Sequence, residues 1–206
     1  MATHEQVVID PEDPGLLNAN IAIGARLMVS AVVFLFMSFV FGFFYLRALN
    51  SNHSFLMPHV KPPDGWGVAV LICVLGATAV FEVARRQLRD GTGGAWRMGA
   101  GIATALALAA VVLQAIEYFN LSFGAADGGL ASVFFGFTVV FAIFWLGGAY
   151  WIETLWAQSL RQPRHAAGDI NAPSQVLRPS ADGCLLYLGV MSVVEILAFI
   201  LLYLVK

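Results

Sequence analysis

Long apolar runs separated by short polar segments dominate the chain. Five of these runs are close to the ~20 apolar residues that an α-helix needs to cross a bilayer core. We expect spans at about residues 24–47, 65–84, 98–119, 129–156 and 183–205. The fourth run is too long for an upright helix, so it should tilt or protrude. The pattern predicts an all-α polytopic membrane protein, a bundle of five transmembrane helices over residues 21–206 after a polar, acidic tail over residues 1–20.

The third run carries small residues at a spacing of four and no charge before Glu117. Such stripes allow two membrane helices to approach closely, because lipid offers no hydrophobic drive for their association. The two neighbouring stripes are Gly99, Ala103 and Ala107, and Gly101, Ala105 and Ala109. We therefore expect this helix to lie at the centre of the bundle.

Three polar residues lie near the C-terminal end of the same run. Gln114, Glu117 and Tyr118 are spaced i, i+3 and i+4, so they project from one side of a helix. This spacing predicts a polar cluster at one end of the third span.

Composition agrees with a membrane location. Hydrophobic residues make up 59% of the chain and charged residues 12%, and the mean hydropathy is +0.78. A soluble domain has about 25% charged residues. The net charge is −2 and the basic residues form no dense patch, which argues against a nucleic-acid partner.

The distribution of basic residues predicts the orientation. Most of them lie in the second and fourth loops, which share a side with the N-terminus in a five-span protein: Arg85, Arg86, Arg89, Arg97, Arg161, Arg164 and Arg178. Basic loops stay on the cytoplasmic side. We expect a cytoplasmic N-terminus and a C-terminus on the outside.

Candidate ligands and nucleophiles are few in the predicted spans. The histidines all fall in the tail and loops: His4, His53, His59 and His165. Haem or copper ligation by histidines within the membrane is therefore not expected of this chain alone. His53 and His59 could bind a metal with partners from elsewhere, although solvated loop histidines are the simpler interpretation. No phosphate-binding loop or serine elbow occurs, so we predict no catalytic, cofactor or metal site.

Four carboxylates lie within or at the ends of the spans. Glu82 and Glu153 fall near the cytoplasmic ends and are typical of interfacial charges. For Glu117, near the other end of its span, a structural role and a functional role are both open. Glu195 lies close to mid-membrane, where a charge costs roughly 2.5–3.5 kcal/mol on insertion scales. It is a candidate proton-relay residue, or a neutral acid that is hydrogen-bonded to a neighbouring helix.

Four segments, taken in order, resemble one family. Gln114, Glu117 and Tyr118 stand in QAIEYFNL as in a Q-x-x-E-Y helix, and SVFFGFT, which begins at Ser132, is similar to an S-x-F-F-x-x-T segment. FGFFYLRA, which ends at Arg47, and EVARRQLRDG resemble the end of a first helix and the loop after a second. The family is subunit III of the haem-copper terminal oxidases (cytochrome c oxidase subunit III), in its short five-helix bacterial form. The similarity covers roughly Ile21 to Tyr203.

This resemblance implies a non-catalytic accessory subunit of a proton-pumping respiratory oxidase in the bacterial cytoplasmic (inner) membrane. Such a subunit stabilises the catalytic subunit, binds phospholipids and supports proton uptake. The haem and copper would belong to the partner subunits I and II, and a larger respiratory supercomplex would be a further partner. Arg26, Arg85 and Arg86 are the candidate contacts for lipid headgroups.

The chain departs from the family at several positions. Val32 stands where the family has a buried glutamate, and Phe141 and Phe144 stand where it has histidines. Near Ser192 it lacks the family's aspartate. One hypothesis is that Glu195 replaces the lost carboxylate. The alternatives are an accessory subunit of a nitric oxide reductase, a small transporter or channel that works alone, and a membrane scaffold unrelated to respiration.

Overall fold

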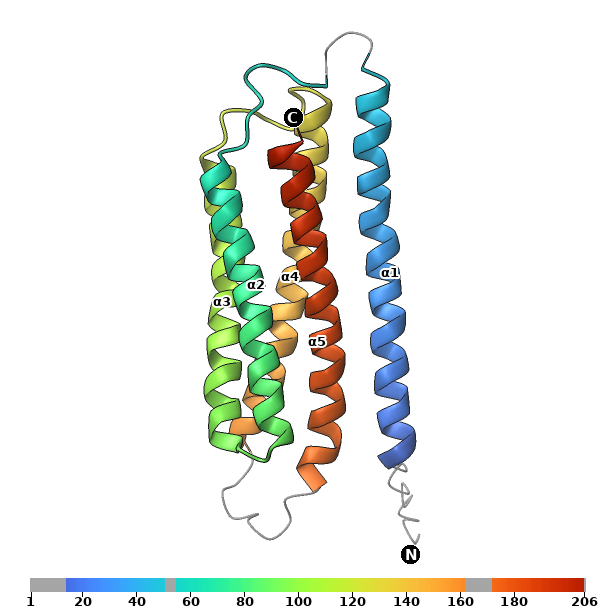
Figure 1. The fold of residues 1–206 in the computed structure, drawn as a ribbon, viewed down its shortest axis with the longest axis vertical. Coiled ribbons are helices and arrows are strands. Elements are labelled where there is room, and N and C mark those ends of the chain that lie inside the picture. Colours follow the sequence, from blue (N-terminus) through green and yellow to red (C-terminus); the bar gives the residue numbers. More distant parts are fainter. Residues whose placement is uncertain (1–13, 51–54, 162–171, 206) are drawn as a thin grey trace, which may run out of the picture.

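The protein is a bundle of long antiparallel helices (Figure 1). The structure is a computed structural model that describes residues 14–50, 55–161 and 172–205, and no strand occurs in these ranges. The helices are α1 (Pro14–Ala48), α2 (Asp64–Arg89), α3 (Gly93–Phe119), α4 (Gly129–Arg161) and α5 (Ala172–Phe199), which continues as a π-helical turn η1 (Ile200–Leu204). All five α-helices are long and apolar enough to cross a membrane. The predicted five-helix transmembrane bundle is confirmed.

The described chain begins and finishes at opposite ends of the bundle. α1 begins at one end, and η1 finishes at the other (Figure 1). An odd number of antiparallel crossings produces this arrangement. Which end faces the cytoplasm stays a prediction from the arginine distribution.

The helices extend beyond the apolar runs, mainly at the arginine-rich end. α1 begins at Pro14, inside the segment expected to be a polar tail, and α5 begins at Ala172, inside the expected fourth loop. Proline suits a first helical turn, because its missing N–H would have no partner there. α4 has 33 residues and is therefore about 50 Å long, well beyond a ~30 Å hydrocarbon core. Its predicted tilt or protrusion follows from this length.

α2 and α3 pack along a regular seam. Their buried positions alternate three and four residues apart, which is the spacing of a left-handed coiled-coil interface. The series are Gly67, Val70, Val74, Ala77, Phe81, Ala84 and Leu88 on α2, and Trp96, Ala100, Ala103, Ala107, Ala110, Gln114 and Glu117 on α3. A Cβ added at Gly99 would lie 2.7 Å from that of Ala84, so glycine is needed there. The first predicted small-residue stripe is thus in the interface, whereas Ala105 of the second is exposed.

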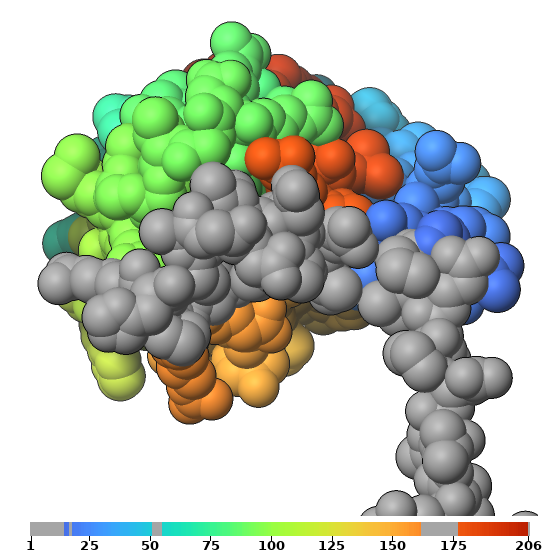
Figure 2. Space-filling model, turned by 90° about the horizontal axis from the view of Figure 1, so that it is seen from below, coloured from blue at the N-terminus to red at the C-terminus, as the bar shows by residue number. Residues whose placement is uncertain are grey.

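The expectation that the third span is central is wrong. α5 packs against α1, α2 and α4, and half of its most apolar window is buried (50%), compared with a third for α3 (33%). Seen from the end where α1 begins, α5 lies between α2 and α1 (Figure 2). The alanine stripe brings α3 close to one neighbour, but Met98, Ile102 and Val112 on its other side are exposed.

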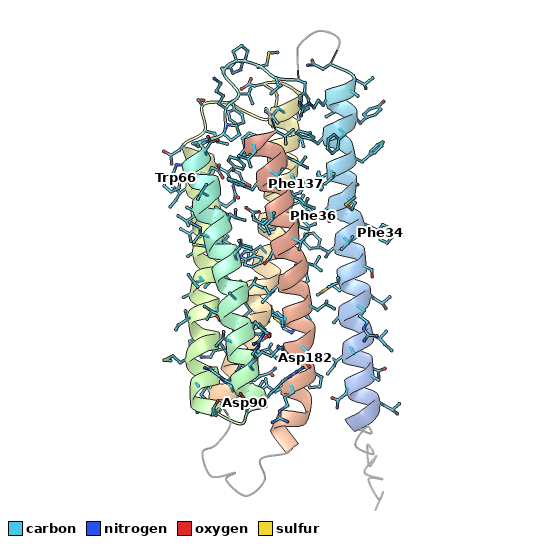
Figure 3. All side chains as sticks on the ribbon, in the orientation of Figure 1. Phe34, Phe36, Trp66, Asp90, Phe137 and Asp182 are labelled. Atoms are coloured by element: carbon cyan, nitrogen blue, oxygen red, sulfur yellow. The ribbon has the colours of Figure 1, made fainter. Side chains whose placement is uncertain are left out.

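α1 is the least buried helix, with 17% of its most apolar window inside the bundle. Phe36 faces the core and contacts Phe137 of α4 with ring centroids 5.3 Å apart. Phe34, two residues earlier, points away from the bundle (Figure 3) and is 78% exposed. α1 is therefore attached along one narrow side.

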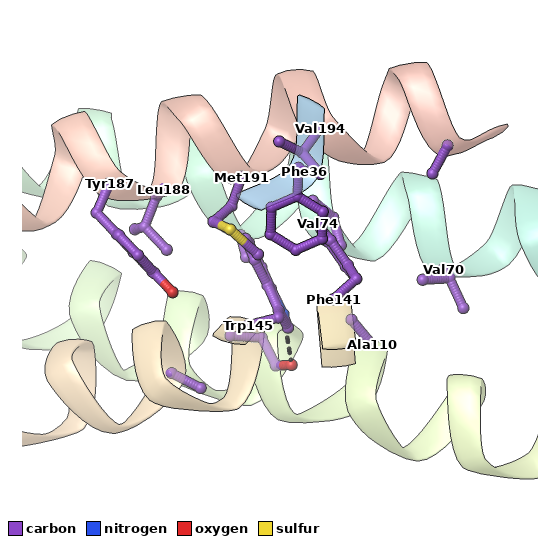
Figure 4. Packing of buried hydrophobic residues seen from close by; sticks show 14 of the residues in the cluster. Phe36, Val70, Val74, Ala110, Phe141, Trp145, Tyr187, Leu188, Met191 and Val194 are labelled. Carbon is purple, nitrogen blue, oxygen red and sulfur yellow. Dashed lines mark hydrogen bonds between the residues drawn. The ribbon is translucent and has the colours of Figure 1, made fainter. Parts of the chain in front are cut away.

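The core between α3, α4 and α5 includes one hydrogen bond from an indole. Trp145 is buried, stacks on Phe141 and donates from Nε1 to the carbonyl oxygen of Ala107 at 3.0 Å (Figure 4). Met191 and Leu188 of α5 are fully buried in the same cluster. This bond satisfies the polar atom of a large side chain that is otherwise packed in apolar surroundings.

Candidate functional site

Glu117 ends the α2–α3 seam and is fully buried. Gln114 Nε2 donates to its Oε2 at 2.7 Å, and the Tyr203 hydroxyl donates to its Oε1 at 2.6 Å. Each carboxyl oxygen therefore has a donor, one from α3 itself and one from the end of the chain. Gln114 and Glu117, two of the three residues of the expected polar cluster, are thus hydrogen-bonded, and Tyr203 is a partner that sequence reasoning missed.

Two features of the backbone position Tyr203. It lies in η1, and π-helical turns of this kind occur frequently at functional sites. Its ring also lies directly on the backbone of α2, since a Cβ added at Gly67 would be 2.6 Å from it. On its other sides the ring contacts Phe134 at 5.9 Å and Phe199 at 5.2 Å between centroids. The close approach to Gly67 brings the hydroxyl within reach of Glu117.

Tyr118 takes a different direction from its two predicted companions. Its ring packs on Phe135 of α4 with centroids 5.8 Å apart. Its hydroxyl is buried and faces Thr138, but makes no hydrogen bond of good geometry with a described residue. The Thr138 hydroxyl instead donates to the carbonyl oxygen of Phe134 at 2.7 Å. Tyr118 thus borders the carboxyl cluster without bonding to Glu117.

Glu195 on α5 belongs to the same buried region and is 6% exposed. Glu117, Tyr118 and Tyr203 are within electrostatic range of one another and of Glu195. Among the described residues, no side chain donates a hydrogen bond to Glu195. The structure thus brings together two candidate residues, Glu117 and Glu195, whose proximity the sequence did not predict. We call Gln114, Glu117, Glu195 and Tyr203 the carboxyl cluster.

A pair of hydroxyl groups lies next to the carboxyl cluster, on the side toward the start of α5. Thr78 of α2 and Ser192 of α5 are hydrogen-bonded at 2.8 Å, and Ser192 lies one turn before Glu195. Thr78 also donates to the carbonyl oxygen of Val74. Sequence reasoning missed Thr78, although a lone hydroxyl inside an apolar run is a usable signal.

At the opposite end, ion pairs join α2 to α5. Arg85 bonds Glu82 at 2.7 Å and Asp182 at 2.8 Å, Arg86 bonds Glu82 at 2.7 Å, and Arg89 bonds Asp182 at 2.9 Å. The Arg85 side chain is 13% exposed and that of Arg86 is 71% exposed. We call these five residues the arginine network. Arg85 and Arg86, two of the predicted headgroup contacts, therefore already have carboxylate partners.

Arg26, the third predicted headgroup contact, lines a cleft between α1 and α5. This cleft of about 270 Å³ also has Arg178 and Asp182 in its wall. A larger apolar cleft of about 470 Å³ lies further along the same two helices. Leu186 lines both clefts, so the basic one adjoins the apolar one.

Metal ligands do not gather in the part of the chain that the structure describes. No group of three or more His, Cys, Asp or Glu side chains there could hold a metal ion. His4, His53 and His165 lie outside the described residues. Cys73 and Cys184 are free thiols.

In comparisons with known proteins, no family model and no curated protein matches this chain. The resemblance to oxidase subunit III therefore stays a prediction that rests on the quoted segments.

Proposed function

We propose that this chain is a non-catalytic accessory subunit of a haem-copper respiratory oxidase, of the subunit III type, in the bacterial inner membrane. It packs beside the catalytic subunit and stabilises it, binds phospholipids and supports proton uptake. Haem and copper are held by the partner subunits I and II. The complex can belong to a larger respiratory supercomplex.

The observation that carries the proposal is a contact in the fold between two of the segments that resemble subunit III. QAIEYFNL lies at the end of α3 and SVFFGFT at the start of α4. Tyr118 of the first packs on Phe135 of the second, and Phe134 contacts Tyr203, which holds Glu117. Two segments that resemble the same family thus form one packed unit, which supports a common origin better than either segment alone.

The clefts beside α1 support the lipid-binding part of the proposal. The larger cleft is lined by apolar side chains of α1 and α5 and by Phe137, which suits an acyl chain. The adjoining cleft is lined by two basic residues, Arg26 and Arg178, together with Asp182, and arginines suit a phosphate. Arg178 also donates to the backbone carbonyl of Arg89, which anchors it beside α2.

Co-purification tests the proposal. The full chain with an affinity tag is isolated from its native membrane in mild detergent, and its companions are identified by mass spectrometry and by the optical spectrum of haem. We expect an oxidase catalytic subunit with haem in stoichiometric amount. A nitric oxide reductase catalytic subunit would favour the related alternative. A stable homo-oligomer without haem proteins would overturn the proposal in favour of a protein that works alone.

A further inference from the structure

The carboxyl cluster contains two acids and, among the described residues, no arginine or lysine. We propose that it is a one-proton binding site, in which Glu195 carries the exchangeable proton and Glu117 remains an ionised hydrogen-bond acceptor. This deepens the proton-uptake part of the proposed function, but it depends only on side chains of this chain.

The hydrogen bonds assign the two roles. An ionised carboxylate accepts hydrogen bonds at both oxygens and donates none. Glu117 receives one at each oxygen, from Gln114 and from Tyr203. A proton on Glu117 would require the amide to turn away, or the Tyr203 hydroxyl to accept in place of donating. The two short bonds, as the structure arranges them, therefore favour the charged form of Glu117.

Glu195 has the opposite environment. It is 6% exposed and receives no hydrogen bond from a described side chain. A second negative charge in the same buried region as the ionised Glu117 would be uncompensated in a low-dielectric interior, and like charges disfavour joint ionisation. The cost of one unpaired charge at mid-membrane is already high. The neutral acid is the form of Glu195 that this site accommodates.

No neighbouring helix supplies a compensating cation. The polar groups that surround the two acids in the described structure are hydroxyls and one amide: Thr78 from α2, Gln114 and Tyr118 from α3, Thr138 from α4, Ser192 from α5 and Tyr203 from η1. Phe36 of α1 is apolar, and the arginine network lies at the other end of the bundle. Only a proton can therefore remove the second negative charge.

Proton exchange at this site is a simple equilibrium. Uptake forms one O–H bond on the Glu195 carboxylate, and release returns the proton and restores the carboxylate. The hydroxyl pair Thr78–Ser192 lies on the side of Glu195 that faces the arginine network.

Infrared spectroscopy of the full chain in lipid nanodiscs tests the assignment. A protonated carboxyl has a C=O stretch that is separate from the amide bands and shifts in D₂O. We expect such a band in the wild-type protein, its loss in Glu195→Gln, and its retention in Glu117→Gln. Glu153→Gln is the matched control, because Glu153 is an exposed membrane-helix glutamate, and it should leave the band unchanged.

Two results would overturn the proposal: no protonated-carboxyl band in the wild type, or a band that Glu117→Gln removes and Glu195→Gln leaves. If Glu195→Gln does not fold, as judged by circular dichroism, Glu195→Asp replaces it. That variant should move the band, and a band at its original position would count against Glu195 as its source. These outcomes are independent of co-purification, so the proton site and the oxidase assignment can fail separately.

Discussion

The two polar regions of this bundle hold their carboxylates in different ways. In the arginine network, Glu82 and Asp182 are each paired with two guanidinium groups. In the carboxyl cluster, Glu117 has only neutral donors, and Glu195 has none among the described side chains. The first region neutralises negative charge with fixed positive charge, so its state is constant. The second has only a proton for this purpose, and only this region can therefore respond to proton supply.

The largest loss of stability is expected from a substitution at Gly67, where the Tyr203 ring of the carboxyl cluster packs on the backbone of α2. In Gly67→Ala, the new Cβ would lie 2.6 Å from the Tyr203 ring, so the ring has to move and its hydroxyl leaves Glu117. Overpacking together with the loss of a hydrogen bond to a charged group should lower the free energy of unfolding by about 3 kcal/mol. The measurement is the unfolding midpoint in detergent by circular dichroism.

Gly65→Ala is the matched control for this variant, because a Cβ at Gly65 meets nothing within 4 Å. It should be neutral or slightly stabilising, since alanine has the higher helix propensity. Tyr203→Phe completes the comparison: when combined with Gly67→Ala, the two losses should be far from additive, because both remove the same bond. Additive losses would mean that Gly67 does not act through Tyr203.

A smaller effect is expected in the arginine network. Arg85→Met leaves Glu82 and Asp182 with one guanidinium each and breaks the link between α2 and α5 that this side chain makes. Because Asp182 is 43% exposed, we expect a loss of about 2 kcal/mol, below the range for fully buried pairs. Arg86→Met on the same helix is the control, and at 71% exposure its loss should be below about 1 kcal/mol. Equal losses would show that burial does not set the difference.

The apolar pattern of the sequence predicts much of the fold. It does not predict which side chains contact one another in the two polar regions. The run between Arg26 and Arg47 predicts a spanning helix by length alone. The apolar pattern of each helix does not determine which helices are neighbours in the bundle. The proximity of Glu117 and Glu195 could therefore not be predicted. Tyr203 is 86 residues from Glu117 in sequence and reaches it through a π-helical turn and a glycine on α2. The local sequence pattern predicts neither the π-helical turn nor the role of this glycine.

The smallest effect on stability, but a specific effect on lipid, is expected in the apolar cleft between α1 and α5. Gly189 lines the apolar cleft, and a Cβ added there meets nothing within 4 Å, so Gly189→Leu directs an apolar side chain into the cleft from an uncrowded position. We expect an unchanged unfolding midpoint and less phospholipid retained per chain by native mass spectrometry. Gly24→Leu adds the same side chain at an exposed site on α1 that also has open space, and it should retain the wild-type amount of lipid. If both variants keep their lipid, the acyl chain does not occupy this cleft.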